Sequence, residues 1–152
     1  MEIDHIDRRI LRELMADGQV TLAELAGRVG LSSSPCWRRV RALEEAGVIR
    51  GYTCSVDAKA VGLGVEVYIL ASLEKHVEFT IQRFREAVLA LPEVIECCSL
   101  TGPRDVVIRA VLTDLDALND FLMTRMLKLP GVAHVETGIV LERMVERRSL
   151  PL

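Results

Sequence analysis

Several patterns are missing from this 152-residue chain, and each absence argues against a class of protein. No apolar run is long enough to cross a bilayer, and the opening residues Met1–Asp4 do not begin a signal peptide. We therefore expect a soluble, cytoplasmic protein without a membrane partner. The four cysteines form no Cys-x-x-Cys pair and no metal-ligand spacing, so we expect no metal and no cofactor. A nucleophile–base pair and a glycine-rich phosphate loop are also missing, which argues against an enzyme.

The cysteines themselves are Cys36, Cys54, Cys97 and Cys98. We expect free, buried thiols of the kind found in a reducing compartment. A redox or thiol-sensing role for the adjacent pair Cys97 and Cys98 stays open.

Charge is unevenly distributed, although the formal net charge is only −3. Residues 28–50 contain five arginines against two glutamates, whereas residues 51–152 contain 11 basic and 14 acidic side chains. A local basic patch on an acidic protein is compatible with DNA contact through one element.

That basic patch is centred on a segment with the features of a short helix. Ser34 can serve as an N-cap and Pro35 suits the first helical position, so we expect a helix to begin there. Because successive helical residues are about 100° apart, Cys36, Val40 and Leu43 share one face, which we expect to be buried.

The opposite face of this helix carries Arg38, Arg41 and Glu45, with Trp37 on a flank. Hydroxyls and free N–H groups of a first turn suit phosphate, and arginine reaches phosphates or guanine edges. A solvated basic helix is the alternative. The expected DNA contacts are Ser33, Ser34, Trp37, Arg38 and Arg41, with Arg28 and Arg50 as flanking phosphate partners.

Two further helices are expected upstream. Asp4 can cap the first, which Asp17–Gly18 ends, and Thr21 with Glu24 makes a capping box for the second. The second helix begins at Leu22, and its expected inward residues are Leu22, Leu25, Ala26 and Val29.

Downstream, Gly47 is expected to close the third helix, and Val48–Tyr52 resembles a short strand or wing. Three such helices, the last two joined by a glycine turn, form a helix-turn-helix unit. A three-helix scaffold with another role is the alternative.

The second half of the chain changes character. Strands are expected at 65–73, 94–100, 106–112 and 132–143, and helices at 79–91 and 115–129. The order βαββαβ describes a ferredoxin-like sandwich, in which two helices cover one face of a four-stranded antiparallel sheet. The fold class is therefore α+β. The expected domains are 1–52, a linker at 53–64, and 65–152.

The first and third strands are almost continuously apolar, whereas a sheet that is wet on one face should alternate. We therefore expect both faces to be buried, most simply by a second copy of the chain. A dimer also suits DNA, because it presents two reading helices to two half-sites.

The whole chain resembles the leucine-responsive/asparagine-type (Lrp/AsnC) family of bacterial and archaeal transcription regulators. The resemblance rests on these motifs: Asp4-x-x-Asp7-Arg8-x-Ile10-Leu11, Val29-Gly30-Leu31-Ser32, Pro35-Cys36-x-Arg38-Arg39-Val40, Leu43-Glu44-x-x-Gly47-Val48-Ile49, Gly51-Tyr52, Thr101-Gly102-x-x-Asp105, Leu129-Pro130-Gly131-Val132 and Ser149-Leu150-Pro151-Leu152. It implies a winged helix-turn-helix domain that binds double-stranded DNA and an ACT-like sensing domain. It also implies dimers that assemble into octamers or larger discs, and an effector, commonly an amino acid, bound between paired sensing domains.

The loop between the second and third strands suits such an effector. Thr101 offers a hydroxyl, Gly102 allows close backbone approach, and Asp105 can pair with an ammonium group. An ordinary hairpin loop, in which Asp105 caps its own turn, is the alternative. The expected effector contacts are Leu100, Thr101, Gly102, Arg104 and Asp105, with Asn119, Met123 and Thr137 as weaker candidates. Val106 stands where the family often has an aromatic residue, which leaves the effector's identity open.

The resulting prediction is a DNA-binding regulator whose operator affinity responds to a small molecule. The rival functions are a ferredoxin-like metabolic enzyme and an amino-acid-binding protein without a regulatory DNA role. The arginine-bearing helix favours the regulator.

Overall fold

The computed structural model describes residues 2–74, 78–147 and 149–152. The chain forms two compact units, one running up to Ser55 and the other covering Val56–Arg143. Residues from Met144 onward, which the sequence placed with the second domain, group with the first unit instead. There the Leu150 N–H donates to the Met15 Sδ at 3.4 Å. No helix in the described part of the chain is long and apolar enough to cross a membrane.

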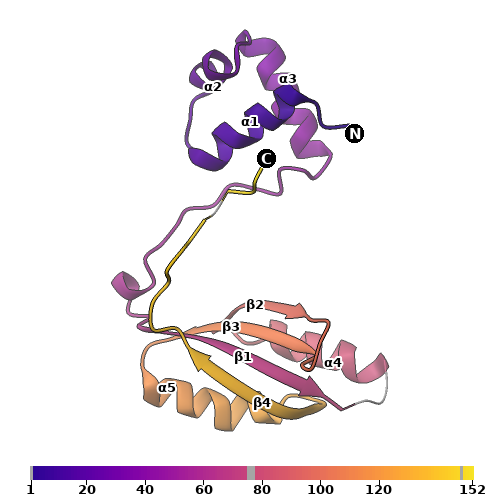
Figure 1. Ribbon diagram of the computed structural model, residues 1–152, viewed down its shortest axis with the longest axis vertical. Helices are drawn as coiled ribbons and strands as arrows, with labels where there is room; N and C mark the ends of the chain where they lie inside the picture. Colours follow the sequence, from indigo (N-terminus) through magenta and orange to yellow (C-terminus); the bar gives the residue numbers. More distant parts are fainter. Residues whose placement is uncertain (1, 75–77, 148) are drawn as a thin grey trace. The chain divides into compact units, whose positions relative to one another are not determined.

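Three helices make up most of the first unit (Figure 1): α1 (His5–Ala16), α2 (Leu22–Val29) and α3 (Ser33–Glu45). Asp4 caps α1, because its carboxylate accepts from the N–H groups of Ile6 and Asp7. The expected capping box of α2 is also confirmed, with Thr21 and Glu24 each satisfying the other's backbone N–H.

The helices meet around a small apolar core. Its buried residues are Ile10, Leu25, Ala26, Val29, Cys36 and Leu43. The predicted inward faces of α2 and α3 are confirmed, and Leu22 is the exception at 37 % exposed.

The start of α3 differs from the prediction. The N-cap is Ser32 rather than Ser34, and Pro35 is the third helical residue rather than the first. The first residues of any helix have N–H groups without an intrahelical acceptor, so proline costs no hydrogen bond at the third position either. The sequence therefore left the start uncertain by two residues.

The end of α3 is the predicted one. Gly47 has a φ of 70°, and the N–H groups of Gly47 and Val48 donate to the carbonyls of Glu44 and Leu43, each at 2.9 Å. The strand expected at Val48–Tyr52 is not formed, because these residues are irregular and join no sheet ladder among the described residues. A strand needs a neighbouring ladder, which composition alone does not supply.

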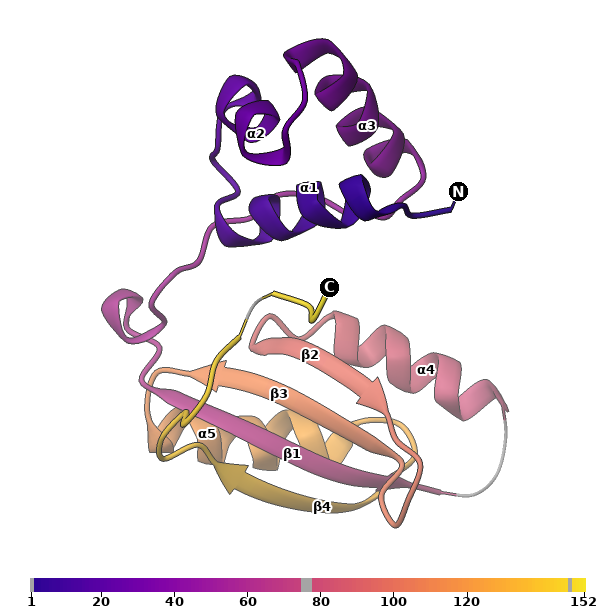
Figure 2. The same ribbon diagram turned by 45° about the horizontal axis from the view of Figure 1, so that its top comes forward.

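The second unit is a four-stranded antiparallel sheet with two helices on one face (Figure 2). Its elements are β1 (Val65–Leu73), α4 (Glu78–Leu89), β2 (Val94–Ser99), β3 (Val106–Leu112), α5 (Leu115–Asp120) and β4 (Val132–Ile139), after a short 3₁₀ turn at Lys59–Val61. The spatial order β2-β3-β1-β4 confirms the ferredoxin-like sandwich and the α+β class.

Two elements end earlier than predicted. β4 stops at Ile139 rather than Arg143, close to the level at which its partner β1 begins. The helix expected over 115–129 is α-helical only to Asp120, then widens into a π-helical turn at Phe121–Arg125 and tightens into a 3₁₀ turn at Met126–Lys128.

Alternate residues of β1 and β3 face the helices and form the main core. Val67, Ile69 and Ala71 pair with Ala110, Ile108 and Val106 across this ladder, and all are buried. Phe84 and Val88 from α4, with Leu118 and Phe121 from α5 and its continuation, cover them.

The other sheet face, here called the open face, is partly exposed in the single chain, and its burial by a second copy of the chain stays a prediction. Tyr68 is 36 % exposed, and the open-face residues of β3 are half-buried. Charge lies among these side chains, because Arg109 Nε approaches Glu66 Oε1 at 2.7 Å and Arg143 also contacts Glu66. Burial raises the pKa of Glu66, but these two arginines together bring it below its usual value.

Candidate DNA interface and effector region

The first turn of α3 is open to a ligand. Ser33 and Ser34 are exposed, and the N-cap Ser32 makes no side-chain hydrogen bond to the helix. Nothing in the described part of the chain bonds the hydroxyls of these three serines. The turn therefore presents free N–H groups and hydroxyls together, which is the chemistry that binds phosphate oxygens.

Two of the expected arginines are also available. Arg38 and Arg50 are exposed and have no hydrogen-bond or ion-pair partner among the described residues. Trp37, beside Arg38, is 52 % exposed. An exposed indole next to an unpaired guanidinium can add stacking or apolar contact to a charge contact.

Arg41 is exposed but engaged. Its Nη1 donates to Glu44 Oε2 at 3.1 Å, and the Tyr52 hydroxyl donates to Glu44 Oε1 at the same distance. Burial, and then the adjacent Glu44, raise the pKa of Tyr52. The ion pair between Arg41 and Glu44 must break before Arg41 can contact a base.

Arg28 is tied to its own unit. Its guanidinium lies 3.3 Å from Glu13 and 3.9 Å from Asp17, and its carbonyl accepts from Arg9 at 2.9 Å. This arrangement holds α1 against α2, and the expected role of Arg28 as a phosphate partner requires these pairs to break.

Arg39 has a structural position that the sequence did not reveal. Its Nη1 donates to Asp4 Oδ2 and Asp7 Oδ1, each at 2.8 Å, so it joins α3 to the start of α1. Asp7 is buried, and a buried carboxylate needs such a partner. The Asp7 N–H and then Arg39 lower the pKa of Asp4 to about 2. Counting Arg39 in the basic patch therefore overstated the charge available to DNA.

The predicted effector loop lies between β2 and β3, where Leu100 and Thr101 are exposed. Asp105 does not cap its own turn there. Its Oδ2 accepts from the Leu73 N–H at the end of β1, at 2.8 Å, and its own N–H donates to the Ala71 carbonyl at 3.0 Å. The carboxylate thus ties the loop to β1 through one oxygen.

The other predicted effector residues are scattered in the single chain. Arg104 reaches from the loop to Glu136 on β4, and this contact is the main reason that the pKa of Glu136 is lowered. Thr137 pairs with Ile69 and so belongs to the helix-covered face, while Asn119 and Met123 are exposed on α5 and its continuation. The loop brings Leu100–Asp105 together, and the other three lie apart from it.

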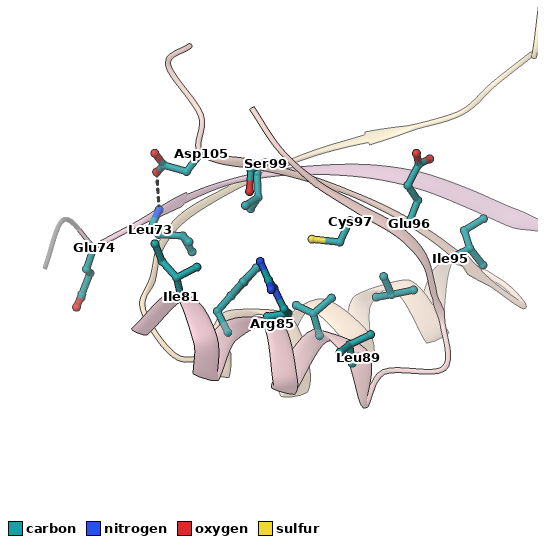
Figure 3. Close-up of a pocket in the computed structure, with 14 residues that line it drawn as sticks. Leu73, Glu74, Ile81, Arg85, Leu89, Ile95, Glu96, Cys97, Ser99 and Asp105 are labelled. Atoms are coloured by element: carbon teal, nitrogen blue, oxygen red, sulfur yellow. Dashed lines mark hydrogen bonds between the residues drawn. The ribbon is translucent and has the colours of Figure 1, made fainter. Parts of the chain in front are cut away.

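A cavity of about 780 Å³ adjoins this region, between α4 and β2 (Figure 3). Its walls include Leu73, Ile81, Phe84, Val88, Val94 and Val106, and its polar lining includes Arg85, Glu96, Cys97, Ser99 and Asp105. Of the predicted effector residues, Asp105 alone is among the lining residues.

The cysteines are free, but only Cys36 is buried. Cys54 lies in the connecting segment, and Cys97 and Cys98 are exposed on β2, an edge strand, which corrects the expectation of buried thiols. Adjacent strand residues face opposite sides of a sheet. Within the described residues, no three His, Cys, Asp or Glu side chains gather as metal ligands.

Comparison with known families assigns both units. Residues 3–50 match a winged helix-turn-helix DNA-binding family, and residues 66–150 match the Lrp/AsnC ligand binding domain. The chain belongs to the Lrp/AsnC family. It is therefore a DNA-binding transcriptional regulator with a ligand-binding domain, and the family does not consist of enzymes.

Individual Lrp/AsnC proteins are similar over their whole length. The chain is 38 % identical over 151 residues to the Bkd operon transcriptional regulator of Pseudomonas aeruginosa, covering 99 % of each protein. It is 35 % identical to the leucine-responsive regulatory protein of Escherichia coli K12, covering 98 % of this chain and 91 % of that protein. A Neisseria meningitidis transcriptional regulator solved with L-methionine superposes with a TM-score of 0.94, at 35 % identity, covering 99 % of this chain and 97 % of that chain.

Proposed function

We propose that the first turn of α3, with Arg38 and Arg50, contacts operator DNA in this regulator. The observation that supports this proposal is the coincidence of free serine hydroxyls, free helix N–H groups and the unpaired Arg38 on α3, with the unpaired Arg50 following five residues after the helix ends. Phosphate contacts fix a protein on the duplex, and an arginine on the reading helix can address guanine. Because operator DNA is its proposed target, we propose a cytoplasmic location for the protein as well.

A gel shift on the DNA upstream of the protein's own gene tests this proposal. We expect binding by the wild type that falls steeply as salt rises, because each phosphate contact releases counterions. Binding that is absent, or insensitive to salt, would contradict it. This assay also separates a regulator from an amino-acid-binding protein without a DNA role.

We also propose that an amino acid bound at the loop of Leu100–Asp105, between subunits, alters operator binding. Support comes from the carboxylate of Asp105. Its Oδ2 accepts the Leu73 N–H, which leaves its second oxygen, Oδ1, available to a ligand. That second oxygen can pair with an ammonium group. The N. meningitidis relative was solved with L-methionine, and others are named for their response to leucine.

The loop site is tested by changing the charge and keeping the hydrogen bond. Asp105→Asn still offers an oxygen to the Leu73 N–H but loses its negative charge, whereas Asp105→Ala loses both. If the charge binds an ammonium, we expect both variants to lose amino-acid binding in calorimetry while basal DNA binding is kept. An Asp105→Asn protein that responds to the amino acid as the wild type does would place the effector elsewhere.

A dimer formed through the open face would complete such a site, and octamers are proposed only by likeness to the family. Tyr68, Leu70, Val107 and Val111 supply apolar area on this face, around the Glu66–Arg109 pair. Light scattering of the full chain and of Leu70→Lys tests this. We expect the wild type to dimerise at micromolar concentration and the variant to dissociate, since an unpaired buried charge is unfavourable.

A further inference from the structure

The cavity between α4 and β2 is lined by an exposed arginine that makes no ion pair with the described residues. Arg85 lines the cavity and takes part in no hydrogen bond or ion pair among the described residues. Figure 3 shows its side chain extending from α4 toward β2, into the space between the helix and the sheet. A guanidinium in that position is a ready partner for an anion.

Three carboxylates line the cavity, those of Glu74, Glu96 and Asp105, and Figure 3 shows Glu74 just after the end of β1, to one side of Arg85. Asp105 accepts the Leu73 N–H, and Glu96 lies 3.8 Å from Arg109 across β2 and β3. In Figure 3 both carboxylates point away from α4, whereas Arg85 points toward the sheet. The positive charge at the cavity is therefore left without a counter-charge from these two groups.

Neutral donors share the cavity with Arg85. Cys97 and Ser99 lie on the wall of β2 that faces α4, and neither side chain has a hydrogen-bond partner in the described chain. Although Cys97 is exposed as a residue, partial desolvation of its thiol, and then the neighbouring Cys98, raise the pKa of that thiol, so it stays protonated near neutral pH. A hydroxyl and a thiol that can both donate beside a guanidinium suit a carboxylate.

The remaining walls are apolar. Phe84 and Val88 from α4 and Val106 from β3 are buried residues of the main core, and Ile81 is 54 % exposed at the cavity. At about 780 Å³ the space falls within the range of small-molecule sites, which are mostly apolar with a few placed polar groups. An apolar side chain would replace water against these residues.

We infer that this cavity binds a small carboxylic acid with an apolar tail, using Arg85 as the charge partner of the carboxylate and requiring no ammonium group. The acid can be a free amino acid or a simple branched-chain acid, since both share the carboxylate and the tail. This inference adds a second ligand site to the proposed regulatory function, distinct in chemistry from the Asp105 loop.

Three probes of similar shape separate the two sites by calorimetry on the full chain. They are 4-methylpentanoate, with only the carboxylate, L-leucine, with both charges, and 3-methylbutylamine, with only the ammonium. We expect 4-methylpentanoate to bind and the amine not to bind. Binding of L-leucine as well would identify amino acids as one source of the ligand, and its absence would restrict the site to simple acids.

Arg85→Gln is the test variant, because it keeps most of the side chain's bulk and removes its charge. We expect its affinity for 4-methylpentanoate to fall about tenfold or more, since a hydrogen bond to a charged group is lost. Arg83→Gln is the matched control, because it removes the same charge from the same helix at a position that does not line the cavity. We expect its affinity to match that of the wild type.

A thiol readout reports directly on the cavity. In a Cys36→Ala, Cys54→Ser, Cys98→Ser background, we expect 4-methylpentanoate to slow alkylation of Cys97 and Arg85→Gln to abolish this protection.

The inference is overturned if no probe binds, if the amine binds while the acid does not, or if Arg85→Gln binds the acid as well as the wild type. Should L-leucine binding be lost in Asp105→Asn while Arg85→Gln changes the binding of neither L-leucine nor 4-methylpentanoate, the loop site stands and the cavity site fails. If binding of 4-methylpentanoate requires Arg85 but binding of no amino acid requires the charge of Asp105, the cavity site stands and the loop proposal fails.

Discussion

The two units of this regulator place their functional side chains in different ways. In the first unit one helix, α3, carries the serines and Arg38, so helical periodicity decides what faces outward. In the second unit the groups around the proposed effector loop come from separate elements, as when Arg104 reaches Glu136, 32 residues away. Local patterns in the sequence are therefore informative for the first unit and much less so for the second.

Arg38 and Arg39 show the limit of local patterns within a single helix. They are adjacent in sequence, yet Arg38 is unpaired and Arg39 donates to Asp4 and Asp7 more than 30 residues away. We expect replacements at these two positions to separate folding from DNA binding, and the four predictions below test this contrast between local and long-range placement.

The largest effect is expected for Arg39→Ala. Removing the guanidinium leaves the buried Asp7 without its charge partner, which we expect to lower the free energy of unfolding of the first unit by about 2 kcal/mol, allowing for the partial exposure of Arg39. Trp37 is the single tryptophan and lies in α3, so its fluorescence follows this unit in urea.

Arg38→Ala is the matched control in the same assay, with an expected change of less than about 0.5 kcal/mol, as for a surface position without partners. Equal stability of the two variants would show that the Asp4–Asp7–Arg39 contacts contribute nothing to folding.

The next effect concerns DNA affinity. We expect Arg38→Ala to weaken operator binding by about 1–2 kcal/mol, roughly tenfold, and Arg28→Ala to change it much less, because Arg28 is held by Glu13 and Asp17. Glu44→Gln releases Arg41, and we expect it to tighten binding. These affinities come from gel shifts at one fixed salt concentration, since phosphate contacts are salt-dependent. An unchanged affinity for Arg38→Ala would remove α3 from the interface.

The sequence predicted those features that depend on neighbours along the chain. The caps at Asp4, Thr21 and Gly47 and the βαββαβ order of the elements along the chain came from local signals, and the structure has them. The pairs of Arg39 and Arg28 were not predicted, since they join helices through side chains whose reach no periodicity encodes. The cavity at Arg85 was missed for the same reason, because its walls come from four segments.

Alanine replacements at two glycines are expected to change the stability of the first unit by smaller amounts and in opposite directions. They test the helix signals in the sequence directly. Gly47 has a φ of 70°, so we expect Gly47→Ala to destabilise the first unit by about 1 kcal/mol. Gly27 lies inside α2 with open space where a Cβ would be, so we expect Gly27→Ala to stabilise by about 0.5–1 kcal/mol. Urea unfolding followed by Trp37 fluorescence measures both. The same sign for both variants would contradict the assigned end of α3.

The smallest expected effect is on the pH dependence of stability. It can be compared at one helix N-cap from each unit, Asp4 and Asp114. The Asp7 N–H and then Arg39 lower the pKa of Asp4 to about 2, from an ordinary value of 3.8. The N–H of Ala117 and then the hydroxyl of Thr113 lower the pKa of Asp114, the N-cap of α5. In each case the unfolded state takes up the proton at higher pH than the folded state. The carboxylate's contribution to stability is therefore complete above the ordinary value and is lost as pH falls through the lowered pKa.

Replacement by asparagine removes the titration and keeps the cap, because asparagine caps helices as well as aspartate does. We therefore expect the difference in unfolding free energy between wild type and Asp4→Asn to shrink as pH falls from 5 toward 2, as measured by Trp37 fluorescence. We expect the same trend for Asp114→Asn, measured by far-ultraviolet circular dichroism. Arg39→Gln separates the two caps, since it reduces the pH dependence due to Asp4 and leaves that due to Asp114 unchanged. If Arg39→Gln left the Asp4 difference intact, the local N–H groups alone would set that pKa, and both units would cap their helices by local contacts only.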